Sequence, residues 1–138
     1  MDREVIEHKL ESLRRCLQRV AEKCPSDPDK LSRDPDLQDI VTLNLSRAVQ
    51  LCVDLGAHLI ADLDVSPPDT MGQTFDALAH AGVIPEPLAH QLKQAVGFRN
   101  IAVHHYEEID WAIAHAIALN HLSDFSEFAK TIAARLPR

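Results

Sequence analysis

The feature of this sequence that most constrains its fold is a helical pattern of nearly thirty residues, from Pro35 to about Asp64. Asp34 can cap this helix, and Pro35 fits its first position because the amide hydrogen that proline lacks has no partner there. Apolar residues recur at helical spacing and are expected to face inward: Leu37, Ile40, Val41, Ala48, Leu51, Cys52, Leu55 and Leu59. A helix of this length is unusual in a small domain, so it predicts burial against more than one neighbour.

The composition favours helices throughout the chain. Glycine occurs only four times, and the aromatic residues are one tryptophan, one tyrosine and four phenylalanines. Runs of β-branched and aromatic residues with the alternation of a half-buried strand are missing. At 138 residues the chain is long enough to bury a core of its own. The sequence therefore predicts an all-α protein with a single domain over residues 1–138.

Capping residues and prolines divide the chain into five predicted helices. Thr70 and Gln73 form a capping box, and Gly82 fits the end of that short helix. The five helices are expected from Asp2 to Pro25, from Asp34 to about Asp64, from Thr70 to Ala81, from Pro85 toward Gly97, and from Asp110 onward, with surface loops at Pro25–Asp34 and Ser66–Asp69. The last helix carries an inward stripe that His121 interrupts: Ile113, Ile117, Phe125, Phe128 and Ile132. These elements predict a five-helix bundle.

The net charge of −7 bears on the partners of the protein. A chain with this charge repels polyanions as a whole, so we expect no DNA partner, and any contact with RNA must be local. Positive residues gather in the first and last helices: Arg14, Arg15, Arg19 and Lys23, then Lys130, Arg135 and Arg138. The simpler alternative is that they form ordinary solvated helix faces.

Cysteine usage and hydropathy indicate the compartment. Cys16, Cys24 and Cys52 form no CxxC pair and are odd in number, which suits buried thiols in a reducing cytoplasm. The charged N-terminus, Met1–Glu4, does not resemble a signal peptide, and no run of 18 apolar residues occurs. We expect a cytoplasmic protein without a membrane partner.

The stretch Gly97–Tyr106 carries the chemistry, in the pattern Arg-x4-His-x-Tyr. Arg99 can neutralise a phosphate through two hydrogen bonds, and His104 can exchange protons near neutral pH. Together these groups can bind a phosphodiester and transfer protons during its cleavage. On a straight helix Asn100 and His104 share a face but Arg99 and His104 do not. Three arrangements could still bring Arg99 and His104 to one site. Gly97 could loosen the helix backbone, the long Arg99 side chain could reach across the helix, or two subunits could each contribute residues.

Each residue also has a purely structural interpretation. Arg99 could pair with Glu107 or Glu108, the histidines His104 and His105 could face a helix dipole, and Tyr106 could be a half-buried packing residue. Tyr106 lies seven residues after Arg99, so on a continuous helix the phenol and the guanidinium would lie on a common rim. A metal site from His104, His105, Glu108 and either His115 or His121 is disfavoured, because only His104 and Glu108 have the helical spacing of metal ligands. No metal or other cofactor is expected.

The region from about Leu37 to Leu136 resembles the HEPN superfamily and, within it, the HepT-like toxins. The resemblance rests on three segments and their order: Gly82–Glu86, Leu92–Asn100 and His104–Asp110. Asn44 and Arg47 in the long helix match more weakly. A bare Arg-x4-His would be common by chance, but this surrounding string is specific.

This resemblance implies a metal-independent endoribonuclease that works as a homodimer. Arg99, Asn100 and His104 of two protomers would line one shared cleft. His104 would transfer protons, Arg99 would stabilise the charge of the transition state, and Asn100 would position the phosphate or His104. The RNA substrate would be tRNA or mRNA.

The resemblance also implies a partner, a minimal nucleotidyltransferase antitoxin that adds AMP units to the tyrosine of the motif, here Tyr106. A nucleotidyl phosphate beside Arg99 would occupy the guanidinium and block the cleft. The alternative is a non-catalytic helical subunit that binds a nucleotide or substrate for the nucleotidyltransferase and holds a phosphate with Arg99. Expression of the chain alone separates the two, because only a toxin would arrest growth.

Overall fold

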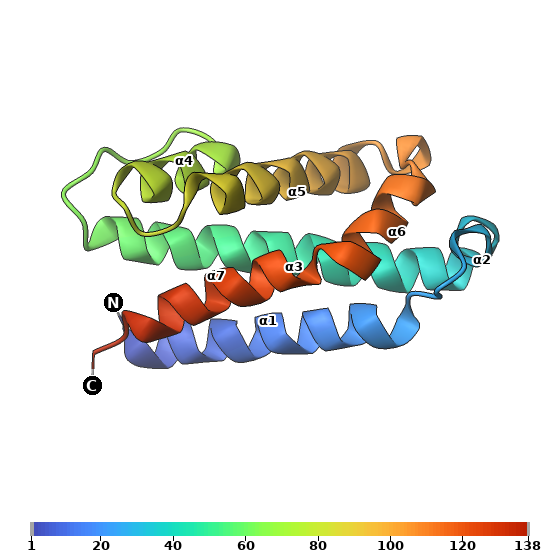
Figure 1. Cartoon of the computed structure of the whole chain (residues 1–138), viewed down its shortest axis with the longest axis horizontal. Coiled ribbons are helices and arrows are strands. Elements are labelled where there is room, and N and C mark those ends of the chain that lie inside the picture. The colour runs from blue at the N-terminus through green and yellow to red at the C-terminus, as the bar shows by residue number, and fades with distance from the viewer. Residues whose placement is uncertain (1, 138) are drawn as a thin grey trace.

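The computed structural model describes residues 2–137, and this part of the chain is helical, without a strand. Its elements are α1 (Arg3–Lys23), α2 (Pro28–Arg33), α3 (Pro35–Ala61), α4 (Met71–His80), α5 (Glu86–His104), the 3-10 helix η1 (Tyr106–Glu108), α6 (Trp111–Asn120) and α7 (Leu122–Ala134). In Figure 1 the helices α1, α3, α5 and α7 run along the long axis, with α2 and α6 at one end and α4 at the other. The all-α prediction is confirmed.

The number of helices differs from the prediction, since residues 2–137 form seven α-helices rather than five. The expected loop from Pro25 to Asp34 contains α2, because the Asp27 side chain caps Asp29 N at 2.9 Å and Pro28 occupies the first position. Leu31 of this short helix is fully buried. The helix therefore forms where its single apolar side chain finds a core site.

The second difference is a break in the last helix at His121, where the backbone leaves helical geometry (φ −124°, ψ 8°). The two halves bury their side chains in different core clusters. The break lets α6 pack against α2 while α7 packs against α1, α3 and α5. The inward stripe is also shifted on α6, where Ala114 and Ala118 are buried and Ile113 is 54% exposed. The expectation that Ile113 faces inward is wrong.

Two hydrophobic clusters make up the core of the described residues. The first lies among α1, α3, α4, α5 and α7 and contains Phe75, Phe125 and Phe128. The second lies toward α2 and α6 and contains Leu31, Phe98 and Ala114. Because α3 contributes side chains to both clusters and contacts every other α-helix, the predicted burial against several neighbours is confirmed. No helix within residues 2–137 has the length and apolarity to cross a membrane.

Candidate active site

The residues of the Arg-x4-His-x-Tyr motif lie at the C-terminal end of α5 and directly after it. Phe98 and Ala102 are buried in the second cluster and hold this part of the helix in place. Asn100 and His104 are exposed, and Arg99 is half-buried. The motif is thus presented on a rigid helix end with its polar groups accessible to a ligand.

The side chain of Arg99 reaches from α5 toward α4. Its Nη1 lies 3.8 Å from the sulfur of Met71 and donates to Oδ1 of Asn100 at 3.3 Å. The helix continues through Gly97, so the backbone is not loosened there. The guanidinium thus contacts the carboxamide of the next residue, Asn100, and within residues 2–137 no hydrogen bond joins it to His104.

The guanidinium of Arg99 forms no ion pair with a carboxylate of residues 2–137. The structural alternative in which Arg99 pairs with Glu107 or Glu108 is therefore wrong. Glu108 instead lies 4.0 Å from Nδ1 of His105. A guanidinium without an internal anion is free to bind a phosphate.

His104 is the last residue of α5, one turn after Asn100 and on the same exposed face. Its imidazole is exposed and has no hydrogen-bond partner in the part of the chain that the structure describes. At His105 the backbone turns out of the helix (φ −142°, ψ 55°). An unpartnered imidazole on the same helix face as a carboxamide can exchange protons with a bound phosphodiester.

Tyr106 begins the 3-10 helix and is held by two contacts. Its hydroxyl donates to Oδ1 of Asp39 in α3, and its ring meets the ring of Trp111 edge-on at 5.9 Å between centroids. The phenol hydroxyl is thus engaged by a carboxylate, although Tyr106 stays 38% exposed. The expectation that Tyr106 shares a rim with Arg99 assumed a continuous helix, and the chain leaves helical geometry at His105, so that spacing argument does not apply.

Partial burial and, after it, the Asp39 carboxylate, which accepts the hydrogen bond and is negatively charged, together raise the pKa of the Tyr106 phenol to about 12. The phenol is therefore neutral at physiological pH. The adjacent carboxylate is the nearest group that could take its proton.

Asp39 is the residue of this site that the sequence did not reveal. It lies in the second turn of α3, 67 residues before Tyr106, in a segment where aspartate is common. Neither its distance in sequence from the motif nor the residues beside it in sequence indicate that Asp39 has a functional role. Only the packing of α3 beside η1 brings the carboxylate to the phenol.

The other histidines named for a metal site have separate partners. Nε2 of His115 lies 2.9 Å from the carbonyl oxygen of Pro25, and Nδ1 of His121 lies 3.2 Å from Asp124 Oδ2. Within residues 2–137, no group of three or more histidine, cysteine, aspartate or glutamate side chains could hold a metal ion.

Comparison with known proteins gives a family match over nearly the whole chain. The family described as Ribonuclease HepT-like matches residues 6–132. The mRNA nuclease HepT of Shewanella oneidensis is 34% identical over 131 residues, which cover 95% of this chain and 98% of that protein.

Two solved structures have the same fold. One is the tri-AMPylated HEPN toxin of Shewanella oneidensis in complex with the MNT antitoxin, with a TM-score of 0.89, 34% identity, and coverage of 98% of this chain and 100% of that chain. The other is a toxin–antitoxin complex with AMP-PNP, with a TM-score of 0.89 and 33% identity. The match covers 96% of this chain and 99% of that chain.

Proposed function

Because the chain belongs to the HepT-like ribonuclease family, we propose that it is an endoribonuclease and the toxin of a toxin–antitoxin pair. The observation that carries this proposal is the end of α5, where Arg99 lacks an ion-pair partner, binds Asn100, and lies on the same short segment as the unpartnered His104. Each of these groups is available to an external phosphate.

The proposed reaction needs no metal ion. A base removes the proton of the RNA 2′-hydroxyl, the resulting oxygen attacks the adjacent phosphorus, and an acid protonates the leaving 5′-oxygen. In the cleft of a homodimer, the His104 imidazole of one protomer takes the 2′-hydroxyl proton and, as an imidazolium, gives a proton to the leaving oxygen. Arg99 neutralises the charge on the phosphorane, and Asn100 holds the guanidinium in place.

Substitution tests the cleavage proposal. Arg99→Ala and His104→Ala should each lower the rate of RNA cleavage by about 10²-fold or more. Neither removes a fully buried side chain, so the thermal unfolding midpoint should hardly change. Cleavage by the wild type should persist in EDTA. Activity of the His104→Ala protein at the wild-type rate would contradict the proton-transfer role.

Subunit mixing tests whether the cleft is shared. Each inactive variant keeps the group that the other lacks, so an Arg99→Ala/His104→Ala heterodimer contains one Arg99 and one His104 on different chains. If the two groups work across the dimer, mixing the purified variants restores part of the activity. If both must come from one chain, the mixture stays inactive.

We assign the control of the toxin to Tyr106 and a minimal nucleotidyltransferase antitoxin. In the proposed step the Tyr106 oxygen forms a bond to the α-phosphorus of ATP, the bond from this phosphorus to the bridging oxygen breaks, and pyrophosphate leaves. The phenol proton passes to Asp39, which already accepts it in a hydrogen bond. The added phosphate and adenosine then obstruct the access of RNA to the motif.

Mass spectrometry of protein co-expressed with the antitoxin tests this assignment. AMP additions located on Tyr106 are expected, and Tyr106→Phe should remain unmodified and toxic. Asp39→Asn should slow the modification by about 10²-fold or more, whereas Asp36→Asn, which removes the same charge one turn earlier in α3, should not. Unmodified wild-type protein that is nonetheless neutralised would contradict control by modification.

A further inference from the structure

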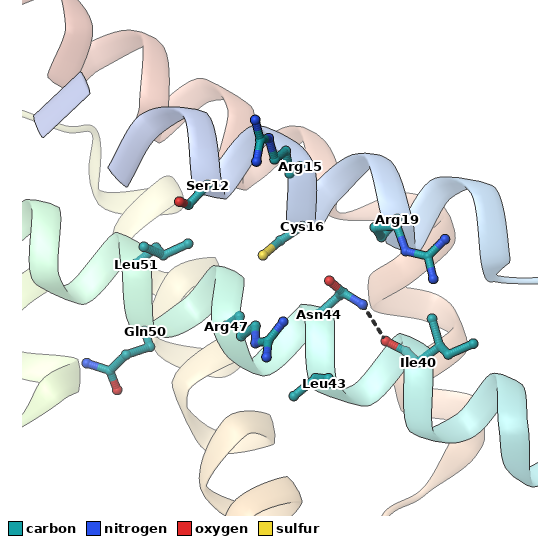
Figure 2. Close-up of a pocket in the computed structure, with 10 residues that line it drawn as sticks. All are labelled: Ser12, Arg15, Cys16, Arg19, Ile40, Leu43, Asn44, Arg47, Gln50 and Leu51. Atoms are coloured by element: carbon teal, nitrogen blue, oxygen red, sulfur yellow. Dashed lines mark hydrogen bonds between the residues drawn. The ribbon is translucent and has the colours of Figure 1, made fainter. Parts of the chain in front are cut away.

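A groove of about 680 Å³ lies between α1 and α3, outside the residues of the proposed reaction. Arg15 and Arg19 line it from α1, and Asn44 and Arg47 line it from α3 (Figure 2). No carboxylate lies in its lining. A chain with a net charge of −7 thus gathers three guanidinium groups in one depression.

The positive charge of the groove is only weakly compensated. Arg47 is exposed and pairs with no carboxylate of residues 2–137. Arg15 Nε lies 3.3 Å from Glu11, and Arg19 Nη1 lies 4.0 Å from Glu22, and all four of these side chains are about half exposed or more. Exposed ion pairs contribute little free energy, so a phosphate can replace Glu11 and Glu22 as the partner of Arg15 and Arg19 at small cost.

The groove begins beside the proposed modification site. Asp39, which binds the Tyr106 hydroxyl, is followed at intervals of four by Leu43 and Arg47, so the three side chains lie along one face of α3. At 1.5 Å per residue, Arg47 lies about 12 Å along the helix from Asp39. A strand that passes Tyr106 can therefore continue into the groove.

We propose that this groove binds the phosphodiester backbone of a single RNA strand, and so holds the substrate beyond the bond that is cut. This inference deepens the ribonuclease function proposed above and rests on it. The three arginines would neutralise successive phosphates, and Leu43, which is 49% exposed, offers an apolar surface to a base. The arrangement explains how an acidic protein binds RNA locally.

The groove favours RNA over the surface of a protein partner because every charged side chain in its lining is an arginine. A protein interface of comparable size mixes both signs and has a larger apolar centre. If the groove instead binds the antitoxin, the test below detects it as a loss of the antitoxin complex with RNA binding retained.

The test measures binding of a fluorescein-labelled 2′-O-methyl oligonucleotide by fluorescence anisotropy over a range of salt concentrations. The blocked 2′-oxygen cannot attack, so the probe is not cut. The protein variants are Arg19→Gln/Arg47→Gln in the full chain. The matched control is Arg14→Gln, because Arg14 lies on α1 outside the groove and binds Glu11 at 2.7 and 3.0 Å.

The double variant should bind about tenfold more weakly, and the slope of log K against log salt should become shallower by about 1.4, or about 0.7 for each lost phosphate contact. The control should match the wild type. Equal binding by all three proteins would overturn the proposal. It would also be overturned if the double variant kept RNA binding and lost only its complex with the antitoxin in gel filtration.

Cleavage of unmodified RNA by the wild type is measured in parallel. If the groove variant loses binding and the wild type cuts no RNA, the groove proposal stands and the ribonuclease function fails. If the wild type cuts RNA and the variant binds normally, the function stands and the groove proposal fails.

Discussion

Tyr106 is the only tyrosine of the chain, so its ionisation can be followed directly by ultraviolet absorbance. The structure places its pKa at about 12, raised by burial and by the Asp39 carboxylate. We expect the titration midpoint of the wild type to lie well above the ordinary value of about 10. Asp39→Asn should lower the midpoint toward that value, because it removes the negative charge. A midpoint near 10 in both proteins would contradict the hydrogen bond.

The same shift predicts how stability changes at alkaline pH. The folded protein keeps the Tyr106 proton above the pH at which the unfolded chain releases it. The stability contribution of Tyr106 is therefore complete below about pH 10 and is lost as pH rises through about 12. Urea unfolding should show a steeper loss of unfolding free energy over this interval for the wild type than for Tyr106→Phe. Parallel curves for the two proteins would contradict the prediction.

Among the helices, α5 contains a glycine that the fold of one chain does not need. Gly97 is exposed in the middle of α5, and a Cβ atom placed there meets nothing within 4 Å. In the monomer, below the dissociation constant of the dimer, Gly97→Ala should therefore raise the unfolding free energy by about 0.5–1 kcal/mol, because alanine loses less backbone freedom on folding. Chemical denaturation measures this change. A loss of stability would indicate a second subunit packed closely on this face.

The opposite result is expected where α3 crosses α4. Gly56 is buried in α3, and a Cβ atom there would lie 2.7 Å from Cγ2 of Thr74 and 3.2 Å from Cδ1 of Leu78. Overpacking of this kind costs about 1–3 kcal/mol. Gly56→Ala should therefore lower the unfolding free energy, although it is the same substitution in the same type of helix. Stability equal to that of Gly97→Ala would contradict the close contact between α3 and α4.

For the whole molecule, the proposed shared cleft requires that the exposed face of α5 meets a second copy. Ile101 lies between Asn100 and His104 and is 42% exposed. Ile101→Asp should weaken the homodimer by tenfold or more in Kd, or about 1.4 kcal/mol, and reduce RNA cleavage with it. Val5→Asp is a control, because Val5 is 37% exposed in the first turn of α1, and this end of α1 lies at the opposite end of the bundle from α6 (Figure 1). Analytical ultracentrifugation decides, and a monomeric, active wild type would exclude the shared cleft.

Much of the helical architecture was determined by local sequence. The predicted caps at Asp2, Asp34, Thr70 and Asp110 all accept backbone hydrogen bonds, and Gly82 has the positive φ of 76° expected at a helix end. The cap hydrogen bonds join residues two or three positions apart. They can be predicted because neighbours in sequence are neighbours in space whatever the remaining fold.

The tertiary structure decided what depends on packing between distant segments. No local sequence pattern predicts that Asp39 binds Tyr106, that the last helix breaks at His121, or that arginines of α1 and α3 line one groove. The first follows from α3 lying beside η1, the second from α6 packing on α2 while α7 packs on α1, α3 and α5, and the third from α3 packing on α1. The sequence by itself thus determined where most of the helices begin, the family resemblance and the motif at Arg99 and His104. Its periodicity leaves open which helix faces meet, because many arrangements bury the same apolar side chains and only the folded chain selects one.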